Sequence, residues 1–140
     1  MNPVRWLRAS SIISLLLAAG HTAGGVLQSW SPMGENDVLR AMRSVHFDAH
    51  GLSRSYLDFY LGFGYSLSVY LLLQAVLLWQ LATMARTDAP RTRPLIASLL
   101  LASVAAAIVS WQFIFLVPAG FSLVVAICLA FAFRAARQSL

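Results

Sequence analysis

Three side chains in apolar surroundings have the chemistry of an acid/base site. His21 lies inside the first of four apolar stretches. An ionisable group is energetically costly to keep at membrane depth, so its presence there suggests a function. Asp58 opens the second stretch, and Tyr65 follows about two turns later. A histidine and a carboxylate form an acid/base pair, while a tyrosine hydroxyl stabilises a developing oxyanion. We therefore expect His21, Asp58 and Tyr65 to be catalytic residues for proton transfer.

A pocket at one level of the membrane follows from counting residues along the helices. At about 1.5 Å per residue, His21 and Tyr65 fall at the same depth in the outer leaflet. The loop that precedes the second stretch ends above them, at the expected mouth of the pocket. Spaces between the helices of a bundle are common ligand sites. We expect a lipophilic small molecule or lipid to bind there, through five further side chains: Gln112, Trp111, Ser66, His46 and His50.

Metal and haem binding are alternative uses of the same histidines. His46 and His50 are four residues apart, which places them on one face if a helix continues through them, and Asp58 or His21 would supply a third zinc ligand. His21 alone would serve as an axial haem ligand. Because the histidine pair lacks the glutamate of helical zinc sites, we expect no metal or cofactor, with zinc and haem as open alternatives.

Structural roles account for the same residues without catalysis. His21 would hydrogen-bond Gln112 or Tyr65 across a helix interface, since lipid cannot satisfy a polar side chain. Ser55 and Asp58 have the spacing of a helix-capping box. On this alternative the protein is a non-catalytic membrane bundle that binds a lipid, quinone, haem or partner subunit.

Several other chemistries are excluded or disfavoured. Cys128 is the only cysteine, so an intrachain disulfide and a CxxC redox pair are excluded. The glycines of the segment 62–64 are not a phosphate loop, because the lysine and the strand-to-helix context are missing. No carboxylate lies in the middle of an apolar stretch, as a proton-coupled exporter would require. Acid/base chemistry of the isomerase, cyclase or lyase type is the enzymatic function that these exclusions leave.

The composition shows that a membrane must position these residues. Of 140 residues, 59% are hydrophobic and 11% are charged, and the mean hydropathy is +0.74. A soluble domain has about 25% charged residues. Spans of about 20 apolar residues predict an all-α fold, a four-helix transmembrane bundle that forms a single domain over residues 1–140. The expected spans are 4–28, 56–84, 94–116 and 119–133.

The arginines predict the orientation of the bundle. Seven of the ten arginines precede or open the first span, separate the second from the third or follow the fourth, so they share one side of the membrane. By the positive-inside rule this side is cytoplasmic, and both termini lie there. No basic stripe with interleaved aromatic residues is present, so we expect no nucleic-acid partner. Arginine without lysine, together with much alanine, suggests a bacterial inner membrane.

The outer loop, residues 29–55, is long for a connection between helices, which is typical of a lid or binding element. Apolar residues from Val38 to Phe47 alternate with charged ones, and this pattern predicts an amphipathic helix over 36–47. We expect this helix to lie over the mouth of the bundle or in the membrane interface.

Small and polar residues at helical spacing predict the packing faces of the spans. In the first span this face carries Ser11, Ser14, Ala18, His21, Gly25 and Gln28. In the second it carries Asp58, Gly62, Tyr65 or Ser66, and Val69. In the third it carries Ser98, Ala102, Ala105, Val109 and Gln112. A homo-oligomer is expected to be possible, with residues 105–107 or the fourth span at the contact.

Overall fold

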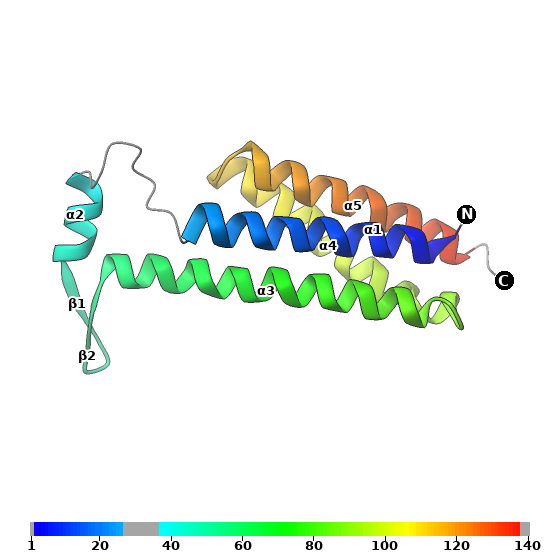
Figure 1. Ribbon diagram of the computed structural model, residues 1–140, viewed down its shortest axis with the longest axis horizontal. Coiled ribbons are helices and arrows are strands. Elements are labelled where there is room, and N and C mark those ends of the chain that lie inside the picture. Colours follow the sequence, from blue (N-terminus) through cyan, green and yellow to red (C-terminus); the bar gives the residue numbers. More distant parts are fainter. Residues whose placement is uncertain (1, 27–36, 138–140) are drawn as a thin grey trace. The chain divides into compact units, whose positions relative to one another are not determined.

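The computed structural model describes residues 2–26 and 37–137 of the chain, and it is mainly helical (Figure 1). In chain order the elements are α1 (Pro3–Gly20), the π-helix η1 (His21–Val26), α2 (Asp37–Ser44), β1 (His46–Ala49), β2 (Leu52–Ser55), α3 (Tyr56–Met84), α4 (Ala89–Phe113) and α5 (Leu116–Arg137). The expected helical fold is confirmed, with a short two-stranded sheet that the sequence pattern did not indicate.

Four helical segments are long and apolar enough to cross a membrane, as predicted, and they indicate an integral membrane protein. α3 has the expected bounds. α4 begins at Ala89 rather than at Pro94, because the Asp88 side chain caps it by accepting the Arg91 N–H, and Pro90 lies in its first turn. α5 covers Leu116–Arg137 rather than 119–133.

The chain divides into two compact units, Met1–Leu17 with Leu71–Leu140 and Ala18–Tyr70, which we describe separately. The first unit contains most of α1, the second part of α3, and α4 and α5. Leu7, Leu78, Ile96 and Leu129 are fully buried in its core. Buried alanines complete the same core and allow close approach of the helices, namely Ala82, Ala85, Ala89, Ala132 and Ala136.

Polar side chains in the first unit bond across helices or contact aromatic rings. The buried Ser11 hydroxyl donates to the Ala75 carbonyl at 2.7 Å, and the Gln74 amide donates to the Ser14 hydroxyl at 3.3 Å. The Arg8 guanidinium lies 5.0 Å from the centre of the Trp79 ring. These contacts satisfy polar groups on helices that lipid would leave unpaired.

The predicted packing face is correct for α1 and wrong for α4. Ser11, Ser14 and Ala18 are buried, whereas Gln28 lies outside the described residues. On α4 the expected residues are exposed, and a different face is buried through Thr92, Ile96, Ser103 and Ser110. α4 carries serines on both faces, so small size and polarity did not identify the covered one.

In the second unit, β1 and β2 form an antiparallel hairpin in which His46 pairs with Ser55 and Ala49 with Leu52. The two residues between the strands, His50 and Gly51, have positive φ values of 57° and 85°. Two central residues with positive φ are the requirement of a type I′ turn, whose twist matches a β-hairpin. The expected helix over 36–47 is therefore wrong beyond Ser44, where α2 ends.

Candidate functional site

His21 lies in the second unit, at the start of η1, and is half-buried. Its Nε2 atom is 3.1 Å from the Gly64 carbonyl oxygen of α3. Because a carbonyl only accepts hydrogen bonds, Nε2 is the protonated nitrogen of this ring. In the neutral imidazole Nδ1 then carries the lone pair, so His21 retains one atom able to accept a proton.

Two hydroxyl groups extend the contact of His21 with α3. The Thr22 hydroxyl lies 2.8 Å from the Ala18 carbonyl and 2.9 Å from the Ser68 hydroxyl. The Ser68 hydroxyl donates to the Gly64 carbonyl at 3.2 Å. The Gly64 oxygen therefore accepts two hydrogen bonds besides its place in the helix. This polar network ties η1 to the first part of α3 and accounts for His21 without a ligand.

Gly64 allows the approach that this network requires. A Cβ atom built on it would lie 3.0 Å from Cγ2 of Val26, which is closer than side chains normally tolerate. A single π-helical turn, rare and often found at functional sites, brings residues 21–26 to this position. Because Gly64 has no side chain, the η1 segment can pack directly against the backbone of α3.

Asp58 caps α3. Its Oδ2 atom accepts the Ser55 N–H at 2.9 Å, and its own N–H donates to the Ser55 hydroxyl at 3.1 Å. This reciprocal pair is the capping box that the spacing indicated. Arg54 and His46 lie near enough to act electrostatically on the exposed carboxylate. Asp58 therefore has a structural role, and its exposed position leaves it accessible to a ligand.

An open groove of about 390 Å³ lies beside Asp58 in the second unit. It is lined by Ala49, Arg54, Asp58, Phe59, Gly62, Phe63 and Ser66. Phe59 and Phe63 meet edge to face, with ring centres 4.9 Å apart. Gly62 leaves the helix surface uncovered by the part of the chain that the structure describes, since a Cβ there would have no neighbour within 4 Å among those residues. The groove therefore combines a guanidinium, a carboxylate and two aromatic rings.

The sequence-predicted residues are only partly brought together. Asp58 and Ser66 line the groove, whereas His21 and Tyr65 do not. Tyr65 is 48% exposed, and the expected packing face of α3 is wrong, because its less exposed side carries Gly64 and Ser68 instead. Trp111 and Gln112 belong to the first unit, where both are exposed on α4.

His46 and His50 do not share a helix face, which corrects the geometry expected for a zinc pair. His46 lies on β1, where its Nδ1 donates to the Ser44 carbonyl at 2.9 Å. His50 is at the tip of the hairpin, where its left-handed backbone serves the turn. Among the described residues, no three histidine, cysteine or carboxylate side chains gather in a way that would hold a metal ion.

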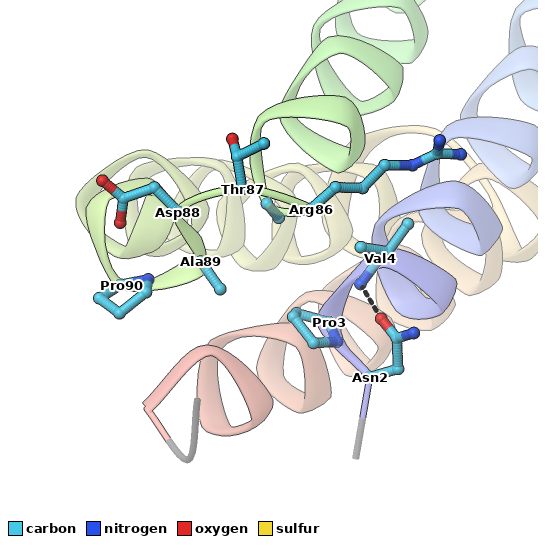
Figure 2. A pocket seen from close by; sticks show the side chains of 9 residues that line it. Asn2, Pro3, Val4, Arg86, Thr87, Asp88, Ala89 and Pro90 are labelled. Carbon is cyan, nitrogen blue, oxygen red and sulfur yellow. Dashed lines mark hydrogen bonds between the residues drawn. The ribbon is translucent and has the colours of Figure 1, made fainter. Parts of the chain in front are cut away.

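A second hollow, of about 520 Å³, lies in the first unit where α1 and α4 begin (Figure 2). Its lining includes Asn2, Arg86 and Asp88. The Asn2 side chain accepts the Val4 N–H at 2.9 Å, as Figure 2 shows, and Asp88 accepts the Arg91 N–H at 3.1 Å. The side chains of Asn2 and Asp88 thus cap two helices.

Sequence reasoning did not assign five of the residues that line the groove to the site: Ala49, Arg54, Phe59, Gly62 and Phe63. One signal was present. Phe59 and Phe63 are four residues apart near the start of an apolar helix, so they share a helix face. Gly62 lies between them in the sequence and has no side chain, which leaves the helix backbone accessible next to the two rings. Comparisons with protein-family models, curated proteins and solved structures gave no match.

Proposed function

We propose that this integral membrane protein binds an amphipathic, lipophilic molecule in the groove formed by Arg54, Asp58, Phe59, Gly62 and Phe63. The observation that carries the proposal is the composition of the groove. Its aromatic rings and exposed helix surface suit an apolar chain, and its two charges suit a polar head group. The rings and Asp58 belong to the first turns of one apolar helix, α3, and Arg54 belongs to the strand β2 that precedes it.

The position of the groove along α3 supports an amphipathic ligand. At about 1.5 Å per residue, α3 is roughly 43 Å long, which exceeds a hydrocarbon core of about 30 Å. Tyr56, Phe59 and Tyr60 lie toward its first end and Trp79 toward its second, and aromatic residues concentrate at both membrane interfaces. The charged part of the groove would then lie among lipid head groups, and Phe63 and Ser66 in the upper acyl region.

The orientation of the protein is part of this proposal. We place both termini in the cytoplasm of a bacterium and the groove on the outer side of its inner membrane, because seven arginines share the opposite side. The four spans would form one transmembrane bundle, and α2 with the hairpin would lie at its outer end as a partly amphipathic cover. The exposed alanines of α4 leave room for a homo-oligomer.

An enzyme that transfers protons within a lipophilic substrate is the second candidate. Its catalytic residues would be His21, Asp58 and Tyr65, with isomerisation, cyclisation or elimination as the reaction. The favouring observation is the bond from His21 Nε2 to Gly64, which leaves Nδ1 as the basic atom of the neutral ring. Because His21 does not line the groove, binding is the better-supported function.

Native mass spectrometry of the detergent-purified protein tests the binding proposal. We expect wild-type protein to retain a lipid-sized adduct and Gly62→Leu to lose it, because the new side chain would occupy the groove without contacting protein atoms at its Cβ. Gly120→Leu is the matched control, since that helical glycine on α5 also has no neighbour within 4 Å of a built Cβ. Equal retention by both variants, or none by wild type, would contradict binding in the groove.

A further inference from the structure

We propose that the ligand of the groove is a zwitterionic phospholipid, with its phosphate on Arg54 and its ammonium group on Asp58. This inference rests on the proposed function and specifies the class of molecule bound. It follows from the charges of the groove, from the hydrogen-bonding capacity that each charged group retains, and from the aromatic rings beside them.

Arg54 is free to bind a phosphate. Its side chain is exposed, and its Nη1 donates a hydrogen bond to the Ser53 carbonyl at 3.2 Å. A guanidinium has five N–H donors in a planar fork that matches phosphate oxygens. Among the described residues, Arg54 makes no salt bridge within 4.0 Å, since the one such pair there joins Arg40 to Asp37. Most of its donors therefore remain for a ligand.

Asp58 and the two phenylalanines suit an ammonium group. The carboxylate uses part of its acceptor capacity for the Ser55 N–H, and an ionised carboxylate has about four acceptor positions. Phe59 and Phe63 are 52% and 65% exposed beside it. Because an aromatic face attracts a cation, these rings would add to the attraction of the carboxylate for an ammonium group.

The balance of charge decides between lipid classes. The groove lining has one cationic and one anionic side chain. An anionic lipid would gain the attraction of Arg54 and meet repulsion from Asp58, and a cationic amphiphile would meet the reverse. A zwitterionic head group satisfies both charges together. The acyl chain would continue past Phe63 and Gly62 toward Ser66, along the uncovered surface of α3.

Competition between two lipids tests this assignment. The purified protein is incubated with equimolar phosphatidylethanolamine and phosphatidylglycerol that carry identical acyl chains, and retained lipid is identified by native mass spectrometry. We expect wild type to prefer phosphatidylethanolamine by about fivefold to tenfold, the range for one exposed charge pair plus a cation–π contact. Asp58→Asn should clearly reduce this preference, because the amide oxygen still accepts the Ser55 N–H but carries no charge, and only the contact of the ammonium group with the aromatic rings remains.

Arg54→Gln should weaken retention of both lipids, since each has a phosphate. Arg40→Gln is the matched control, because Arg40 is an exposed arginine on α2 outside the groove. Equal retention of the two lipids by wild type, or a preference for phosphatidylglycerol, would overturn the head-group assignment while leaving the proposed function intact. Loss of all lipid from wild type would instead contradict the proposed function.

Discussion

At the scale of single residues, His21 shows how a polar group is kept in an apolar helix. Sequence reasoning paired it with another side chain, Gln112 or Tyr65, whereas its partner is the backbone carbonyl of Gly64. Most side-chain hydrogen bonds go to backbone or water. A carbonyl carries no sequence signal of its own, so this partner became visible only when the packing of η1 on α3 was known. The position of His21 was predictable and its contact was not.

Replacing His21 separates its structural from its chemical role. We expect His21→Ala to lower the free energy of unfolding by about 0.5–1.5 kcal/mol, because one hydrogen bond is lost while Ser68 still donates to the Gly64 carbonyl. His21→Gln should recover part of this loss through its amide N–H donor. Unfolding in mixed detergent, followed by circular dichroism, measures both variants. A catalytic role would appear as activity that Gln cannot restore, and an unchanged unfolding midpoint in His21→Ala would contradict the structural role.

Asp58 is the residue whose local structure was most predictable, because Ser55-x-x-Asp58 is a short-range pattern. We expect Asp58→Ala to destabilise the start of α3 by about 0.5–2 kcal/mol, and Asp58→Asn by less. Hydrogen exchange at the Ser55 amide, compared with a core amide of α3 such as that of Leu78, reads the cap directly. Unchanged protection of Ser55 in Asp58→Ala would be incompatible with the capping box.

At the scale of elements, the hairpin was difficult to predict because a strand pattern directly follows a helical pattern in the sequence. Val45, Phe47 and Ala49 alternate with His46 and Asp48, which is the period of a strand, but this run directly follows residues with helical spacing. The helix predicted over 36–47 therefore wrongly included the first two residues of β1. The turn at 50–51 was marked by one glycine, and the residue before it gave a weak signal, because residues other than glycine rarely adopt a positive φ. Local pattern was sufficient for α2 and ambiguous for β1.

Two nearby glycines of α3 provide a matched pair for testing how η1 packs. Gly62→Ala should raise the free energy of unfolding by up to about 1 kcal/mol, because alanine favours the helix and its Cβ meets nothing. Gly64→Ala should lose this gain and destabilise by about 1 kcal/mol or more, because its Cβ would lie 3.0 Å from Val26. The detergent unfolding midpoint compares them. Equal midpoints would show that η1 does not pack on Gly64.

At the scale of the whole molecule, hydropathy predicted the four spans because the bilayer requires each to be a long apolar helix. It did not predict which helix faces are covered. On α1 the small and polar residues coincide with the buried face, but on α4 they occur on two faces: Ser103 and Ser110 are buried, whereas Ser98 is exposed. Lipid-facing and protein-facing positions are both apolar in a membrane protein, so composition alone distinguishes them poorly.

The orientation of the chain is testable because Cys128 is its only cysteine and is buried in α5. In a Cys128→Ala background, Ser53→Cys places a single thiol in the exposed β2 strand, and Thr87→Cys places one in the exposed turn before α4. We expect a membrane-impermeant maleimide to label Ser53→Cys in intact bacterial cells, with the outer membrane permeabilised. Thr87→Cys should be labelled only after the inner membrane is opened, because the positive-inside rule predicts that a turn flanked by arginines is cytoplasmic. The reverse pattern would invert the topology and place the groove of Arg54 and Asp58 at the cytoplasmic leaflet, where the same zwitterionic ligand would have to be supplied from inside the cell.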